Sequence, residues 1–425
     1  MSQPPRRLLA TAILLAPLTL LALLAQAPIP ASAADNTWSA LASLPQTRGE
    51  PVLALAVDPA DGRVLLAGTG AGEVYRSADA GQSWRLARSG LGRGVAAIAF
   101  SPFKQGLVLA GTRGGGVWRS NDGGATWQPQ AGTESRTIRA FAFTKSATVA
   151  GGDQGVLVSR DGESWSPSGL NQVSVSALAT PVLNEPERLV AGGDATRGSD
   201  PLPLFTSPDG GQSWSPVGGD IAGSSMVAML AAGPVAAQQS ARPLLMGTNS
   251  GLFLSADNGG TWKQLTAGGT LPATDFTAAA FVPNHPERFY VGSDGGVSQT
   301  GGLWSTGDGG DHFRSLNPPL PAVTALALTN EDTPTVYAAS FRGSDHAVML
   351  WSYRDTGGDP RGPAPLASPP AGQGQQVRSA APVASRGWLL PLLAGPEAPY
   401  LVLGTLALLA LLLAGVTHFR RARRL

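Results

Sequence analysis

The carboxylates with the most regular spacing in this 425-residue sequence lie in six short segments that end in an aromatic residue. Their pattern is Ser-x-Asp-x-Gly-x-Ser/Thr-Trp; the third copy is one residue shorter, and the sixth, read from Ser305, is one residue longer and ends in His312-Phe313. A short carboxylate that starts a tight turn accepts hydrogen bonds from later backbone N–H groups, and the glycines allow positive φ. The pattern therefore predicts self-capping turns that need no ligand. The aspartates are Asp79, Asp122, Asp161, Asp209, Asp257 and Asp308, and the tryptophans are Trp84, Trp127, Trp165, Trp214 and Trp262.

Arginine is the second residue type that could bind a ligand, because its guanidinium recognises carboxylates in a bidentate manner. It recurs in segments such as "LARSGLGRGV", "GTRGGGVW" and "TESRTIRAF". Two interpretations remain open: a basic patch for an acidic partner segment, or scattered solubilising residues in a chain where Lys is scarce. The candidate residues are Arg48, Arg88, Arg93, Arg113, Arg136, Arg139 and Arg342.

Other chemistry has little support. The chain has no cysteine, which excludes disulfides, thiolate metal sites and a Cys nucleophile, and the histidines at 285, 312 and 346 lack ligand spacing. We therefore expect no metal and no cofactor. The net charge of +1 gives no reason to expect nucleic-acid binding. Asp153, Asp194 and Asp294 follow expected second strands; they either line a rim or start turns, and turns are favoured.

The elements that position these residues follow from the repeat. The aromatic residues recur every 38 to 51 positions, and each period holds strand-like runs such as "VAAIAFSP", "LVLAGT" and "GGVWRS". Such a period is typical of four-stranded propeller blades. The Asp turns, between third and fourth strands, should then share one face, and the Arg segments should lie on the other.

A seventh set of strands, "VTALALT", "TVYAAS" and "AVMLWS", ends near Asp355 without a following Trp. The N-terminal stretch "ADNTWSALASLPQ" lacks the complementary part of the repeat: it contains Trp38, but no Asp turn precedes this tryptophan. We expect Trp38 to lie in the fourth strand of blade seven, which closes the ring. The predicted fold is all-β, a seven-bladed propeller over residues 34–355 closed by its N-terminal strand.

The two ends predict export and anchoring. Residues 1–33 have a basic start, an apolar run and a small-residue site, as in a cleavable signal peptide. Residues 356–387 form a Pro/Gly-rich linker, and 388–419 hold a membrane-proximal segment and a transmembrane helix (Tyr400–Phe419). The basic tail 420–425 marks the cytoplasmic side. The propeller should thus lie outside the cytoplasm, in the periplasm or at the cell surface.

The Asp turns resemble the Asp-box (BNR) repeat over about three quarters of the chain. Families with this repeat include sialidases, xyloglucan-type endoglucanases, sortilin-type receptors and the photosystem II assembly/stability factors. The last type looks most similar, which implies a seven-bladed propeller whose Arg-rich patch docks a membrane protein during assembly. This chain differs in its C-terminal membrane helix and in lacking a lipobox, so the resemblance supports a scaffold rather than a photosynthetic role.

Enzyme families are matched less well. A retaining sialidase needs an Arg triad and a Tyr nucleophile, but the chain lacks the Arg-Ile-Pro-like motif and Tyr75 is expected to face outward as a structural residue. In the endoglucanases one carboxylate lies in a segment resembling "TGAGEVYRS", where Gly70 stands here. We expect a membrane-anchored, non-enzymatic scaffold for a membrane-associated protein partner. The alternatives are a cell-surface glycoside hydrolase and a receptor-like ligand binder.

Overall fold

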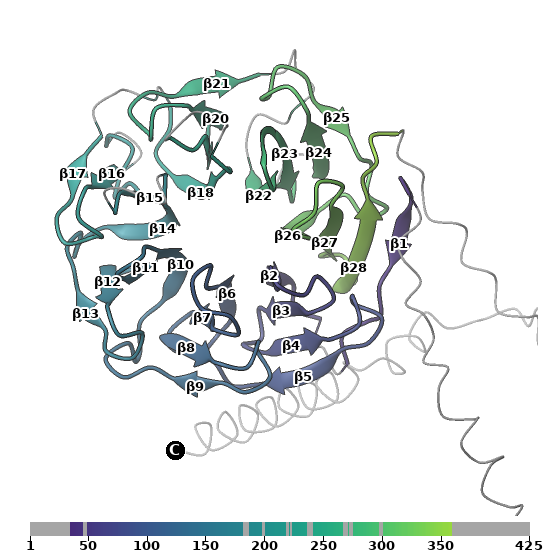
Figure 1. Cartoon of the computed structure of the whole chain (residues 1–425), viewed down its shortest axis with the longest axis horizontal. Coiled ribbons are helices and arrows are strands. Elements are labelled where there is room, and N and C mark those ends of the chain that lie inside the picture. The colour runs from purple at the N-terminus through teal and green to yellow at the C-terminus, as the bar shows by residue number, and fades with distance from the viewer. Residues whose placement is uncertain are drawn as a thin grey trace, which may run out of the picture. The chain divides into compact units, whose positions relative to one another are not determined.

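In the computed structural model, seven four-stranded antiparallel sheets stand in a ring around a central axis (Figure 1). The structure describes residues 35–358, apart from 46–48, 182–186, 198–199, 218–220, 222, 236–240, 267–270, 272–274 and 297–300. The predicted all-β, seven-bladed propeller of four-stranded blades is therefore confirmed. Within the described residues there is no helix of the length and hydropathy that a bilayer crossing requires. The predicted signal peptide, most of the linker, the transmembrane segment and the basic tail lie outside these residues.

The strands follow the order of the chain. Blade one is β2 (Val52–Val57), β3 (Leu65–Thr69), β4 (Val74–Ser77) and β5 (Arg85–Arg88). Blade two is β6 (Val95–Phe100), β7 (Val108–Thr112), β8 (Val117–Ser120) and β9 (Gln128–Pro129). Blade three is β10 (Ile138–Phe143), β11 (Thr148–Gly152), β12 (Gly155–Ser159) and β13 (Ser166–Pro167). Blade four is β14 (Ser174–Ala179), β15 (Leu189–Asp194), β16 (Leu204–Ser207) and β17 (Ser215–Pro216).

The remaining blades complete the ring. Blade five is β18 (Val227–Ala232), β19 (Leu244–Thr248), β20 (Gly251–Ser255) and β21 (Lys263–Leu265). Blade six is β22 (Phe276–Val282), β23 (His285–Ser293), β24 (Gly302–Thr306) and β25 (Arg314–Ser315). Blade seven is β26 (Val323–Leu328), β27 (Thr335–Arg342), β28 (Ala347–Arg354) and β1 (Trp38–Ala40).

The core lies between neighbouring blades rather than inside them. The second strands β3 and β7 are buried over their whole length, because both faces of each sheet pack against another sheet. Close approach requires small residues: a Cβ on Gly68 of blade one would lie 2.6 Å from the side chain of Val95 in blade two. The Ala-Gly-Thr endings of the second strands therefore serve blade-to-blade packing.

Ring closure is made by the N-terminal strand, as the sequence predicts. β1 lies beside β28 (Figure 1) and pairs with it antiparallel, with Trp38 opposite Tyr353. The indole N–H of Trp38 donates to the carbonyl of Leu316 in blade six at 2.7 Å, and Trp38 is only 1% exposed. A single residue of the N-terminal strand thus contacts both blade seven and blade six.

The Asp turns cap themselves. In blade two, Asp122 accepts the N–H and the hydroxyl of Thr126 at 2.9 and 2.6 Å and the hydroxyl of Ser120 at 2.7 Å. Ser120 in turn accepts the N–H of Gly124 at 2.8 Å. Burial alone would raise the pKa of Asp122, but the hydrogen bonds from Thr126, Ser120 and the Ala125 N–H outweigh it and lower the pKa to about 2. No external ligand is needed to hold this turn.

The sixth copy begins at Thr306 and not at Ser305, which corrects its predicted extra residue. The Thr306 hydroxyl donates to Asp308 at 2.8 Å and accepts the N–H of Gly310, as the first Ser does in the other turns. His312 replaces the usual Ser or Thr and places its Nδ1 2.7 Å from Asp308. Thr306–Phe313 therefore has the common length. The third copy remains one residue shorter: Ser159 accepts the N–H of the third following residue, Gly162, rather than the fourth.

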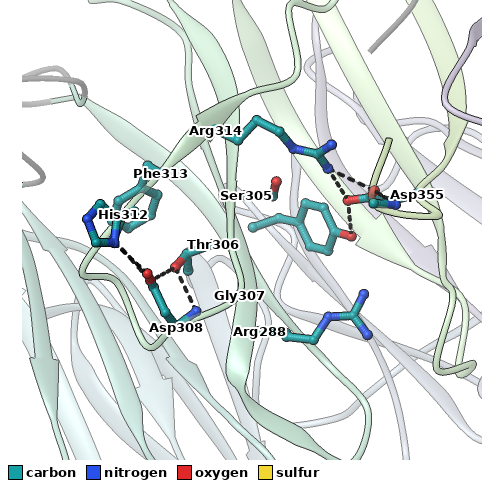
Figure 2. A pocket seen from close by; sticks show the side chains of 11 residues that line it. Arg288, Ser305, Thr306, Gly307, Asp308, His312, Phe313, Arg314 and Asp355 are labelled. Atoms are coloured by element: carbon teal, nitrogen blue, oxygen red, sulfur yellow. Dashed lines mark hydrogen bonds and ion pairs between the residues drawn. The ribbon is translucent and has the colours of Figure 1, made fainter. Parts of the chain in front are cut away.

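Asp355 departs from this pattern and links blade seven to blade six. It accepts the N–H of Gly357, but its carboxylate is also bound by Arg314 at 2.8 and 3.0 Å and by the hydroxyl of Tyr290 at 2.8 Å. Figure 2 shows these groups beside a cavity of about 350 Å³. Asp355 is 3% exposed, so a buried carboxylate and its two partners join the last two blades.

Candidate binding site at the channel mouth

The first strand of every blade contains a β-bulge near its start, after the first residue in six blades and after the second residue in blade four. Bulges re-aim a side chain and are frequent beside functional sites. In three blades the bulged residue donates a hydroxyl to the first carbonyl of the next blade, as Thr277 does to Val323 at 2.7 Å. Arg139 is the one charged member of the set. The seven bulged residues are Leu53, Ala96, Arg139, Ser176, Ala228, Thr277 and Thr324.

Arg139 is held by two aspartates, one directly after the second strand of blade three and one at the end of the second strand of blade four. Its guanidinium lies 2.9 Å from Asp153 and 2.8 Å from Asp194. Asp194 also accepts the hydroxyl of Ser174 at 3.1 Å. The Arg139 side chain is 35% exposed, which leaves this charge network accessible to a ligand but partly shielded.

These residues line a cavity of about 570 Å³ at the end of the channel where the first strands begin. We call this cavity the mouth. Its lining includes Arg113 and the bulged residues Ala96, Ser176 and Ala228, so it spans blades two to five. The lining contains no aromatic side chain among the described residues. The mouth therefore offers charged and hydroxyl groups rather than a stacking platform.

Arg93 and Arg113 stand next to each other at this rim. The N–H of Arg93 donates to the carbonyl of Arg113 at 2.9 Å, and the N–H of Arg113 donates to the carbonyl of Gly94 at 2.8 Å. Gly92 makes the approach possible: its φ is +110°, and a Cβ there would lie 2.9 Å from the Arg113 carbonyl. Both arginines are exposed, and within the described part of the chain neither makes an ion pair.

The other predicted arginines divide into three groups. Arg136 is half-buried next to the same loops, and its carbonyl accepts the N–H of Gly116. Arg88 lies 5.1 Å from the ring centre of Trp118, a cation–π contact, and Arg342 is bound to Asp345 at 2.7 Å. Arg48 lies outside the described residues. A backbone hydrogen bond thus links Arg93 to Arg113, and a shared cavity links Arg113 to Arg139, while Arg342 is paired locally with Asp345.

The chemistry of a glycosidase is only partly present. Two carboxylates, Asp153 and Asp194, converge at the mouth, but both are bound to the same guanidinium. The four tyrosines of the propeller are 0 to 3% exposed, so a sialidase-type Tyr nucleophile is not displayed. The expectation that Tyr75 faces outward is wrong: its hydroxyl is buried and donates to Glu73 at 2.9 Å. In the described residues, no cluster of three metal-ligating side chains occurs.

Sequence reasoning did not anticipate the Arg139 network. Asp153 does lie in a turn, as favoured, yet its carboxylate and that of Asp194 line the rim, which was the other open interpretation. Asp294 starts a turn and accepts the N–H of Gly296 at 3.0 Å. The usable signal was that Gly-Gly-Asp stands at the ends of the second strands of two successive blades, with an Arg near the start of the first strand of the earlier blade.

Comparisons with known proteins agree with this architecture. The model of the DUF6242 beta propeller domain matches residues 60–285, more than half of the chain. The comparison with curated proteins gives no match. Among solved structures, the GH74 xyloglucanase from Xanthomonas campestris is 18% identical with a TM-score of 0.53, over 75% of this chain and 56% of the enzyme. The chain thus spans about half the length of the GH74 structures it matches.

Two further structures are similar over nearly their whole length. YCF48 from Cyanidioschyzon merolae is 13% identical with a TM-score of 0.51, over 76% of this chain and 99% of that one. A structure of YCF48 bound to D1 peptide is 15% identical with a TM-score of 0.52, over 76% and 97%. At these identities the similarity concerns the fold, which enzymes and peptide-binding propellers share.

Proposed function

This chain belongs to the DUF6242 beta propeller domain family, and we propose that it is a binding module whose channel mouth recognises a carboxylate-bearing segment of a protein partner. The observation that carries the proposal is the adjacent pair Arg93 and Arg113. Both residues are exposed, the N–H of Arg93 donates to the carbonyl of Arg113, and no described carboxylate pairs with either side chain. Two exposed arginines whose backbones are adjacent suit one or two carboxylates of a ligand.

Arg139 has a different part in this proposal. Because Asp153 and Asp194 together more than balance its charge, the network carries one net negative charge and does not add to the positive potential at the mouth. The network instead gives the floor of the mouth fixed donors and acceptors, and it keeps the free cationic charge at one side, on Arg93 and Arg113. An acidic segment would then enter over blades two and three and contact Arg136 at its edge.

The partner is proposed to be a membrane-associated protein. Support comes from the fold similarity to YCF48 bound to D1 peptide and from the apolar C-terminal segment Tyr400–Phe419 with its Arg-rich tail. In this proposal the propeller lies outside the cytoplasm on a C-terminal anchor and acts as a scaffold. A receptor-like binder of another ligand would use the same surface.

The second candidate is a cell-surface glycoside hydrolase. It is favoured by the two aspartates at the mouth and by the fold similarity to the GH74 xyloglucanase. A glycosidase needs a protonated acid and a second carboxylate placed about 5 to 10 Å from it. The shared ion pair with Arg139 and the lack of an aromatic lining in the described mouth make this the weaker candidate.

The test is binding of defined peptides to the full-length protein in detergent. The probe is a labelled Glu-rich peptide, and the control is the same peptide with Gln at each Glu. The double variant Arg93→Glu, Arg113→Glu should abolish binding, and the affinity for the Glu peptide should fall steeply with salt. The matched variant is Arg85→Glu, an exposed arginine in the fourth strand of blade one, which should leave binding unchanged.

Equal binding of the Glu and Gln peptides, or equal loss in the Arg85→Glu protein, would contradict the proposal. Cross-linking in host membranes with the same three proteins then asks whether a protein partner depends on the same pair. Release of sugar from xyloglucan, lost in Asp194→Asn but kept in the double Arg variant, would establish the hydrolase instead.

A further inference from the structure

The blades share a row of four paired residues that faces the next blade around the ring. In blade one the row is Ala56, Leu66, Arg76 and Arg85, and in blade two it is Ala99, Leu109, Arg119 and Gln128. In blade six it is Ala280, Tyr290, Ser305 and Arg314, and in blade seven it is Ala327, Tyr337, Ser352 and Ser39. Tyrosine therefore replaces an aliphatic residue at the same place in the last two blades.

A basic side chain of this row joins one blade to the next in several places. Arg76 donates to the carbonyl of Gly123 at 2.9 Å, and Arg119 donates to the carbonyl of Gly162 at 2.8 Å. Each acceptor lies in the Asp turn of the following blade. In blade six, Arg314 binds Asp355 (Figure 2) and also donates to the carbonyl of Gly358. A cation on the third or fourth strand thus bridges to the next blade from blades one, two and six.

The seam between blades seven and one lacks this cation. The row of blade seven ends in Ser352 and Ser39, and a cavity of about 780 Å³ lies where the basic side chain of blade six would be. We call it the closure cavity. Leu41, Ala42 and the Asp turn of blade one form other parts of its lining. The serine side chains are too short to reach across.

Two hydroxyl groups in the lining of the closure cavity have no hydrogen-bond partner among the described residues. Tyr337 is 3% exposed and lines the cavity, and among the described residues its hydroxyl has no hydrogen-bond partner. The equivalent hydroxyl, of Tyr290, is bound to Asp355. Ser352 is 5% exposed and likewise lacks a described partner. Neither hydroxyl oxygen is among the fully buried atoms that lack a partner, so both open into the cavity, where a ligand can replace water as their partner.

The charged residues in the lining indicate which charge the ligand should carry. Two carboxylates, Asp61 and Glu331, lie in the lining. Arg63 is bound to Asp61 through two nitrogens, both at 3.0 Å, and so is already matched. Glu331 makes no ion pair within the described residues, which leaves one negative charge in excess beside the Tyr337 hydroxyl.

We propose that the closure cavity binds an arginine side chain of a partner protein, in the place that Arg314 occupies in blade six. Its guanidinium would donate to the Tyr337 hydroxyl oxygen and to the Glu331 carboxylate, and its alkyl chain would lie along Leu41 and Ala42. A guanidinium presents five donors in one plane and so can serve several acceptors at once. The site lies beside the Asp turn of blade one, and it does not depend on the function proposed for the mouth.

The test uses the full-length protein and two blocked tripeptides, Gly-Arg-Gly and Gly-citrulline-Gly, measured by calorimetry. Citrulline has the shape of arginine without its charge. The Arg peptide should bind at least about tenfold more tightly. Tyr337→Phe removes only the hydroxyl and should weaken binding by about tenfold, and Glu331→Gln should weaken it by a similar factor. Tyr290→Phe is the matched control, because its seam already contains Arg314, and it should leave binding unchanged.

A second variant keeps the proposal falsifiable if the first ones fold poorly. Ser39→Arg places an arginine at the position equivalent to Arg314. It should fill the cavity, raise the melting temperature and abolish binding of the Arg peptide, while Ser39→Ala should do neither. No binding at about 10 mM peptide, equal binding of the citrulline peptide, or full binding by the Ser39→Arg protein would overturn the proposal.

Discussion

Trp38 and Tyr353 pack against each other across the junction of the first and last strands, with ring centres 5.0 Å apart. Both are buried, and the Trp38 indole also donates to the carbonyl of Leu316 in the preceding blade. The ring is therefore closed by a hydrophobic and hydrogen-bonded contact as well as by the backbone pairing of β1 with β28.

Trp38→Ala should lower the free energy of unfolding by about 3 to 5 kcal/mol, because it leaves a cavity at the closure. Trp38→Phe keeps the packing against Tyr353 but leaves the buried Leu316 carbonyl unpaired, at a cost of about 1 to 3 kcal/mol. Urea unfolding of both proteins measures the two effects. A Trp38→Ala protein as stable as the wild type would show that β1 is not needed for closure.

Asp355→Asn should destabilise the protein strongly, by about 3 to 5 kcal/mol, because the neutral amide leaves the Arg314 cation without its buried counter-charge. The matched change is Asp345→Asn, which breaks an exposed pair with Arg342 and should cost less than about 1 kcal/mol. Thermal and urea unfolding of the two variants give the comparison. Similar losses for both would mean that burial of the Asp355 pair has no special effect.

Stability should fall in acid between about pH 4 and pH 2. The pKa values of Asp79, Asp122, Asp161, Asp209, Asp257 and Asp308 are all lowered in the folded state, that of Asp122 to about 2. Stabilisation by a carboxylate with a depressed pKa is complete above its unfolded value and is lost as pH falls through the folded value. Asp122→Asn should unfold with a shallower pH dependence in this range. An unchanged slope would contradict the capping role.

Arg139→Met should destabilise the mouth, since Asp153 and Asp194 would then face each other without a cation. Adding Asp153→Asn and Asp194→Asn should recover part of the loss, with a coupling of roughly 1 kcal/mol or more. The measurement is a thermodynamic cycle from urea unfolding of the four proteins. Additive effects would mean that the three side chains do not act as one network.

The blade count and the closing strand could be predicted because the repeat is periodic, and Trp38 supplied the aromatic residue that blade seven lacks. Residues far apart in sequence were harder to relate. Arg139 meets its two aspartates only because a bulge turns it toward the channel and two blades stand side by side. The Asp355 contact with Tyr290 and Arg314 likewise depends on the packing of blade six against blade seven, which brings these side chains together. The start of the sixth turn was predicted one residue too early, because Thr306 and not Ser305 provides the hydroxyl that the first serine provides in the other turns.

The pairing of the first strand with the last has a consequence for the order of folding. The side-chain amide of Asn36 donates a hydrogen bond to the hydroxyl of Thr356, although 320 positions separate the two residues. Such contacts carry a large loop-closure entropy and form late. Six blades can assemble from neighbouring strands, whereas the seventh must wait until almost the whole domain is available. Until then β28 remains an unprotected sheet edge, and the residues around Trp38 remain exposed. The rate at which Trp38 becomes shielded from quenchers should therefore report the last step of folding.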